Sequence, residues 1–198
     1  QWSSSAASDV YKRQLLKLLE NIDHQIGNLD YNISIVVVND GSTENTPNNF
    51  PDYSKIHSIK IINLKANVGH ARSIATGLKF IIENDDFDYV IPMDSDGEDR
   101  PDEIKDLIKK ITPHSNLPIV CERVKRSEGI FFRFCYFLHK FITFTFTGQS
   151  IRFGNFTCLP KEVVKNMINE KATWSSFSGA LSKIAKLKIG VPSERGTR

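Results

Sequence analysis

Apolar positions recur along the chain with helical spacing in some stretches and with strand-like alternation in others. The helical spacing predicts helices over residues 15–26, 68–84, 101–111, 160–169 and 176–186. Short apolar or β-branched runs bounded by turn formers predict strands over residues 33–38, 56–64, 87–93, 117–121, 153–159 and 187–191. This alternation of strands and helices favours one α/β domain with a mostly parallel sheet flanked by helices.

The ends of these elements carry recognisable signals. Gly27 stops the first predicted helix, and Asn67 is the expected N-cap of the helix over residues 68–84. Pro101 occupies a first-turn position, followed by the acidic Asp102 and Glu103 that the helix dipole favours. Residues 1–14 are rich in Ser and Ala and have no period, so we expect a non-native or disordered leader followed by a domain over residues 15–198.

Two predicted strands end in acidic residues. Asp94 and Asp96 follow the strand over residues 87–93, and Asp40 follows the strand over residues 33–38. In extended backbone the first two side chains leave on the same side, where their charges repel unless a cation lies between them. Ligands of open parallel sheets bind beyond the carboxyl ends of the strands, so we expect a site with a hard divalent metal there. The alternative is that these residues only form turns and helix caps.

Composition restricts the classes of function. The 198 residues carry a formal net charge of +3, which is too small to argue for nucleic acid as a partner. The three cysteines, Cys121, Cys135 and Cys158, have no metal-ligand spacing, which favours reduced thiols and a cytoplasmic location. We find no signal peptide and no apolar run long enough to cross a bilayer.

The segment from Ile130 to Phe146 is dominated by aromatic and aliphatic residues, interrupted by Arg133, His139 and Lys140. A helix of this composition suits a bilayer interface, which would give peripheral contact with the cytoplasmic face of a membrane. A buried helix or an aromatic β-hairpin explains the same residues.

Three ordered blocks give the chain a resemblance to a known family. They are Val37-Val38-Asn39-Asp40-Gly41-Ser42, then Asn67-Val68-Gly69-His70-Ala71-Arg72, then Met93-Asp94-Ser95-Asp96-Gly97. Together they resemble a family 2 glycosyltransferase with the GT-A fold, nearest the polyprenyl-phosphate glycosyltransferase type. The resemblance covers about residues 15–198.

The resemblance implies a nucleotide-diphosphate sugar donor, Mg²⁺ or Mn²⁺, and inversion at the anomeric carbon. Asp40 matches the aspartate that contacts the nucleotide base, in a turn shaped by Gly41 and Ser42. The block beside the nucleotide and diphosphate is matched by Asn67, Gly69 and Arg72. The catalytic and metal-binding pair is matched by Asp94 and Asp96, with Asp96 expected on the metal and Asp94 nearer the ribose or a water on the metal. His70 is given no role.

The acceptor side is expected to be basic. Arg123 flanks the expected approach of an anionic acceptor, with a solvated surface as the alternative. Arg100 could bind phosphate through its planar guanidinium group, with a surface ion pair as the alternative. The family segments before the acceptor-side strand and at the end of the catalytic domain are matched by Arg152, Arg195 and Arg198. No Glu-Asp pair for a general base occurs near residues 172–177, which favours a polyprenyl-phosphate acceptor over a sugar hydroxyl. Glu170 is nearby and fits a helix surface better.

The departures from the family keep other interpretations open. The family's first strand is absent, as are the segments that often follow the position of Arg198, so the chain is expected to be truncated at both ends. A nucleotidyltransferase and a phospho-acceptor receiver domain also gather carboxylates at strand ends. A non-catalytic nucleotide-binding fragment is the non-enzymatic alternative.

Overall fold

The computed structural model describes residues 4–27, 29–42, 47, 49–111, 116–123 and 153–194. Its helices are α1 Ser4–Ile26, α2 His70–Asn84, α3 Ile104–Lys109, α5 Lys161–Asn169 and α6 Phe177–Ile184, with 3-10 helices η1 Pro101–Glu103 and η2 Lys171–Trp174. Its strands are β1 Ile33–Asn39, β2 Ile56–Asn63, β3 Tyr89–Val90, β4 Ile119–Arg123, β5 Phe153–Pro160 and β6 Ile189–Ser193.

The described strands form two sheets. The first holds β1 and β2 in parallel, and the second has the order β3-β5-β4-β6. Within the second sheet β4 and β6 are parallel, whereas β5 runs antiparallel to both β3 and β4. The predicted α/β class is confirmed, and the departure from a mostly parallel arrangement lies in β5.

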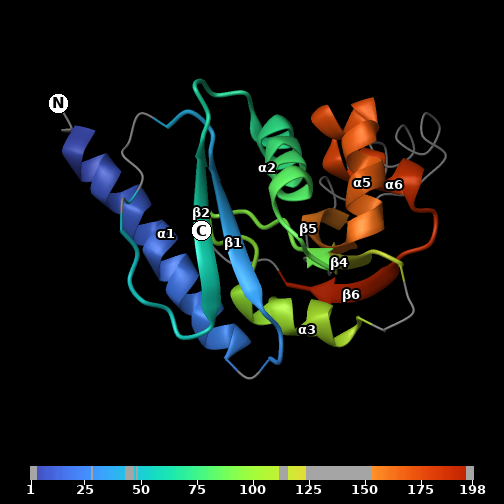
Figure 1. The fold of residues 1–198 in the computed structure, drawn as a ribbon, viewed down its shortest axis with the longest axis horizontal. Helices are drawn as coiled ribbons and strands as arrows, with labels where there is room; N and C mark the ends of the chain where they lie inside the picture. The colour runs from blue at the N-terminus through green and yellow to red at the C-terminus, as the bar shows by residue number, and fades with distance from the viewer. Residues whose placement is uncertain are drawn as a thin grey trace, which may run out of the picture.

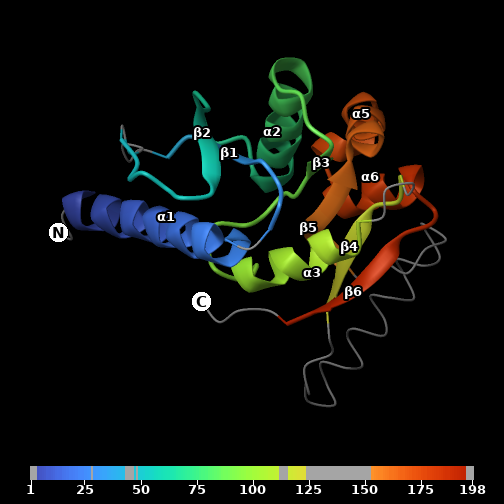
Figure 2. The same ribbon diagram turned by 60° about the horizontal axis from the view of Figure 1, so that its bottom comes forward.

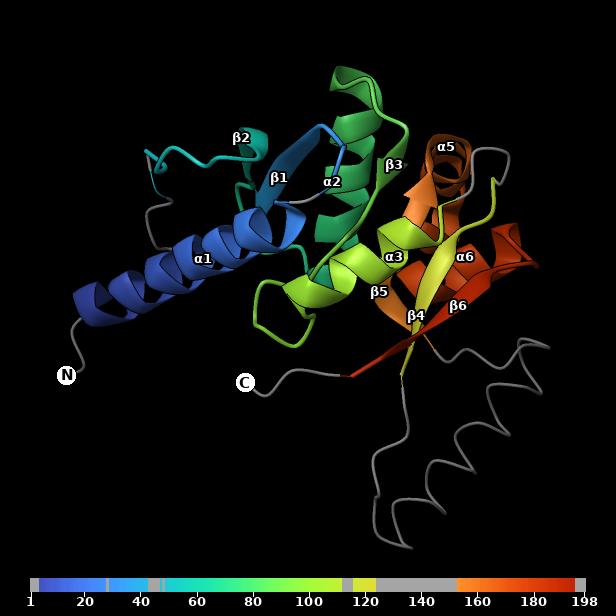
Figure 3. The same cartoon turned by 90° about the horizontal axis from the view of Figure 1, so that it is seen from below.

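The strands separate two hydrophobic clusters. Helices α1 and α3 pack on one face through Ile22, Ile26 and Leu107, and α2, α5 and α6 pack on the other (Figures 1 and 2). Strand β4 contributes to both clusters, because successive side chains of a strand point to opposite faces. Ile119 and Cys121 join the first cluster, and the intervening Val120 joins the second. Figure 3 shows β4 and β6 side by side beneath the helices.

Several boundaries differ from the prediction, among them the start of the first helix and both ends of β3. Helix α1 begins at Ser4, so part of the segment that was set outside the fold is helical, consistent with the helix-forming residues Ala6 and Ala7. Strand β3 covers only Tyr89–Val90, because its pairing with β5 is confined to these two residues. None of the described helices combines the length and apolar character needed to cross a membrane.

Candidate active site

The carboxylate of Asp40 connects the end of β1 to the turn before α2. Its Oδ1 accepts a hydrogen bond from the Val68 N–H at 2.7 Å, and its Oδ2 accepts one from the Gly69 N–H at 3.0 Å. Next to it, the buried Asn39 donates from Nδ2 to Asn63 Oδ1 at 2.9 Å and accepts at Oδ1 from the Ser42 N–H at 3.0 Å. These bonds hold the carboxyl ends of β1 and β2 and the start of α2 together.

The expected N-cap of α2 is wrong. The helix begins at His70 with Gly69 as its N-cap, at φ 90°, and no side chain caps it. The Asp40 carboxylate holds the Val68 and Gly69 amides in the turn before the helix, so the helix begins after them. Asn67 is therefore exposed in this turn and does not cap the helix. Arg72 is exposed in the first turn of α2.

Asp94 is held by hydrogen bonds through its backbone and its side chain. Its backbone N–H donates to Asp99 Oδ2 at 2.8 Å, and its Oδ1 accepts from Asn155 Nδ2 on β5 at 2.7 Å. The Nε2 atom of His70 lies 3.7 Å from the same Oδ1, which is beyond hydrogen-bonding distance. The Asp94 side chain is 27% exposed, so it faces solvent while its orientation is fixed.

Asp96 is exposed in the loop that follows β3. Its Oδ1 accepts from the Glu98 N–H at 3.0 Å, and Gly97 supplies the positive φ of 85° that this turn needs. The interpretation of these residues as turn formers therefore holds for the local backbone. It does not compete with ligand binding, because a carboxylate offers about four lone-pair positions.

The two acidic strand ends lie on the same side of the protein. Gly69 donates to Asp40, and the next residue along the chain, His70, lies beside Asp94. Sequence reasoning gave His70 no role, although it lies inside one of the three recognised blocks.

The acidic loop is also tied to the end of β6. Glu103 is buried, and its carboxylate accepts from Ser193 Oγ at 2.6 Å and from the Glu194 N–H at 2.7 Å. Arg100 pairs with Asp102 at 2.6 Å and lies 3.5 Å from Glu194. The ion pair expected of Arg100 is present, and its contact with phosphate stays a prediction. The role of Glu103 was missed because its partners lie 90 and 91 positions away in the sequence.

The remaining acceptor-side residues are placed only in part. Arg123 is the last residue of β4. Three of the predicted residues and the aromatic segment lie outside the described residues, namely Arg152, Arg195, Arg198 and residues 130–146.

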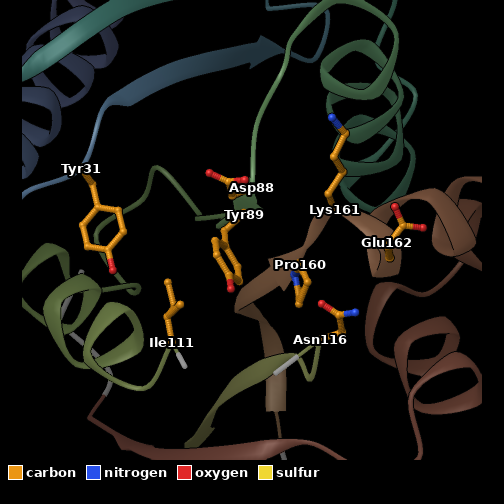
Figure 4. Close-up of a pocket in the computed structure, with 8 residues that line it drawn as sticks. All are labelled: Tyr31, Asp88, Tyr89, Ile111, Asn116, Pro160, Lys161 and Glu162. Carbon is orange, nitrogen blue, oxygen red and sulfur yellow. The ribbon is translucent and has the colours of Figure 1, made fainter. Parts of the chain in front are cut away.

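Two cavities differ in size and place. One of about 20 Å³ lies beside Asp94 and is lined also by Asp99, Asn155 and Ser193, with room for about one water molecule. A larger one of about 440 Å³ lies at the amino-terminal end of β3, where Tyr31 and Tyr89 lie across from Lys161 and Glu162 (Figure 4). It is lined by none of the predicted donor-site residues, so its volume gives no support to a donor site there.

The acidic residues fit a particular kind of metal site. Within the described ranges, no three side chains of His, Cys, Asp or Glu come together as a metal-binding group. Asp94 and Asp96 nevertheless offer the hard oxygen donors that Mg²⁺ takes, and Mg²⁺ is usually held by one or two carboxylates completed by substrate phosphate and water. The donor set suits a cation shared with a diphosphate rather than one held by protein alone.

Comparison with known proteins places these residues in context. Residues 10–161 match the family described as Glycosyl transferase family 2. An uncharacterized protein of Methanocaldococcus jannaschii is 29% identical over 102 residues, which cover 50% of this chain and 42% of that protein. An uncharacterized glycosyltransferase of Synechocystis is 32% identical over 95 residues, 48% of this chain and 29% of the relative.

A third relative has a named activity. The poly-beta-1,6-N-acetyl-D-glucosamine synthase of Staphylococcus epidermidis is 34% identical over 62 residues, 31% of this chain and 14% of the synthase. The chain thus spans less than half the length of each of these relatives.

Proposed function

Because the chain belongs to glycosyl transferase family 2 and has the GT-A fold that membership implies, we propose that it transfers a sugar from a nucleotide-diphosphate donor to an acceptor, with inversion at the anomeric carbon. The observation that carries the proposal is that Asp40 and Asp94 both lie at the start of α2, because Gly69 donates to Asp40 and the adjacent His70 lies 3.7 Å from Asp94. A donor that contacts both carboxylates can therefore lie along one continuous surface.

The nucleotide half of the donor is assigned to the end of β1. Asp40 contacts the base, in the turn formed with Gly41 and Ser42. Its two backbone hydrogen bonds fix the carboxylate and leave lone pairs for a ligand N–H group. Asn67, Gly69 and Arg72 lie beside this turn and are assigned to the nucleotide and diphosphate, with Arg72 supplying positive charge from an exposed position.

The diphosphate half is assigned to the loop after β3. Asp94 and Asp96 would hold Mg²⁺ or Mn²⁺ against the diphosphate, with Asp96 in direct contact. The cation supplies Lewis-acid stabilisation of the charge that develops on the departing diphosphate. Asp99 contributes by accepting a hydrogen bond from the Asp94 N–H, which fixes the backbone that carries the Asp94 carboxylate.

A polyprenyl phosphate is the proposed acceptor. Its phosphate oxygen is already anionic and needs no general base, whereas a sugar hydroxyl does. Glu170, the acid nearest the position expected for such a base, is hydrogen-bonded to Lys183, and this bond together with that from the Ala172 N–H lowers its pKa. A lowered pKa makes Glu170 a poor base near neutral pH.

A glycan acceptor is the second candidate, because one matched relative is named as a poly-N-acetylglucosamine synthase. The two acceptors are separated by supplying the chain with a labelled donor and either a short-chain polyprenyl phosphate or an N-acetylglucosamine oligomer. Label transferred only to the oligomer would reject the polyprenyl-phosphate proposal. Flotation with anionic vesicles tests the proposed membrane contact through residues 130–146.

The donor site is tested by thermal unfolding of the chain with Mn²⁺ and a panel of nucleotide-diphosphate sugars. The matching donor should raise the melting temperature, because it binds only the native state. Asp96→Asn should abolish the Mn²⁺-dependent part of the shift, whereas Asp52→Asn, on an exposed residue away from these loops, should leave it unchanged. No shift with any donor would reject the proposed function.

A further inference from the structure

We propose that Asn155 is a positioning residue of the donor site, which holds the Asp94 carboxylate in the orientation that the cation and diphosphate require. This inference rests on the function proposed above. It starts from the hydrogen bond of 2.7 Å from Asn155 Nδ2 to Asp94 Oδ1, which joins residues 61 positions apart in the sequence.

The strand register explains why these two residues meet. In the antiparallel pair of β3 and β5, Tyr89 lies opposite Pro160 and Val90 lies opposite Leu159. Counting four residues on from Val90 and four residues back from Leu159 reaches Asp94 and Asn155. Residues 91–94 are no longer paired with β5, so the register brings the two segments toward each other and the side-chain hydrogen bond completes the contact.

A local irregularity falls at the same place. The pairing of β4 with β5 shifts register between Val120 and Glu122, next to the part of β5 that carries Asn155. Bulges of this kind redirect a side chain, and they are frequent beside active sites. Asn155 and Asp94 also line the same cavity of about 20 Å³.

An amide is well suited to this role. It donates to the carboxylate without bringing a positive charge of its own, so it does not compete with a cation for the charge of the carboxylate. Partners that orient a metal-binding carboxylate commonly matter by about 10–100-fold in metal affinity. Asn155 acts through Asp94 and is not assigned a contact with substrate.

The test is a titration with Mn²⁺, with UDP or GDP present, in which free Mn²⁺ is followed by its paramagnetic resonance signal. Asn155→Leu keeps the approximate volume and removes the donor, so it should raise the apparent Kd for Mn²⁺ by about 10–100-fold. Asn155→Gln keeps an amide donor, so its apparent Kd for Mn²⁺ should rise less than that of Asn155→Leu. Asn166→Leu, on the exposed face of α5, should leave the Kd unchanged.

The outcomes separate the two proposals. If the unsubstituted chain binds Mn²⁺ with nucleotide and Asn155→Leu binds it equally well, the role of Asn155 is wrong and the proposed function stands. If the unsubstituted chain does not bind Mn²⁺ with either nucleotide, both proposals fall. Should Asn155→Leu not fold by circular dichroism, Asn155→Ala decides by the same criterion.

Discussion

Gly41 lies so close to Asn67 that a Cβ atom built on Gly41 would come within 2.4 Å of the Asn67 backbone nitrogen. Gly41 also has φ +67°, a conformation that other residues rarely adopt. The turn after β1 can therefore lie against residues 66–67 only with glycine at this position.

Gly41→Ala should consequently destabilise the protein by roughly 3 kcal/mol or more, through backbone strain and a steric clash together. Urea unfolding measures the loss. Gly97→Ala is the matched control, because Gly97 has φ +85° and no atom within 4 Å of its built Cβ. It should lose only about 1–2 kcal/mol. Equal losses in the two variants would show that the close approach at Gly41 is unimportant.

Asp40→Ala should lower the free energy of unfolding by about 1–3 kcal/mol, because the amides of Val68 and Gly69 lose a charged acceptor. Asp40→Asn keeps one acceptor oxygen, so its free energy of unfolding should lie between those of the unsubstituted chain and Asp40→Ala. Asp52→Ala, on an exposed side chain, is the control. An unchanged urea midpoint in Asp40→Ala would mean that the turn before α2 does not depend on the carboxylate.

Asp23 predicts a pH dependence of stability. Burial acts to raise its pKa, but hydrogen bonds from Lys55, Ser54 and Ile56 outweigh burial and hold the pKa below the ordinary 3.8. A carboxyl with a lowered folded-state pKa stabilises the protein fully above its unfolded-state value and loses this contribution as the pH falls through the folded-state value.

The stability advantage of the unsubstituted chain over Asp23→Asn should therefore be constant near neutral pH and shrink as the pH falls below about 3.8. Urea unfolding at a series of pH values measures it, with Glu20→Gln on the exposed part of α1 as control. An advantage that grows on acidification would contradict the role of the ionised carboxylate.

The two described cysteines should be inert in the native protein. Burial raises the pKa of Cys158 to about 12, and burial with the nearby carboxylates of Glu103 and Asp99 raises that of Cys121 to about 12. At pH 8 the reactive thiolate is then about a thousandfold scarcer than for a thiol of pKa 9.0. Iodoacetamide followed by peptide mass mapping should modify both residues only in urea. Rapid native labelling at either would show that its strand opens.

Local patterns predicted two neighbouring elements well. The strand over residues 153–159 and the helix over residues 160–169 match β5 and α5 almost residue for residue, because a short apolar run, a helical spacing and the proline between them are encoded locally. The antiparallel direction of β5 was not predictable, since it depends on strands far away in the sequence.

In the candidate site, too, the locally encoded features were predictable and those that depend on distant residues were not. The blocks containing Asp40 and Asp94 were visible in the sequence because each is a strand followed by turn formers. The roles of His70, Glu103 and Asn155 depend on contacts with residues 24, 90 and 61 positions away, which no local pattern encodes. The cap of α2 was misplaced for the same reason, as Asp40 holds the turn from another strand.

The contact between β5 and the acidic loop sets an order of events during synthesis. While the ribosome has released only the chain up to β4, the loop after β3 has its carboxylates but lacks the amide from β5. If the proposed function holds, affinity for the cation and nucleotide should therefore reach its full value only late in translation, after Asn155 has emerged and β5 has inserted between β3 and β4.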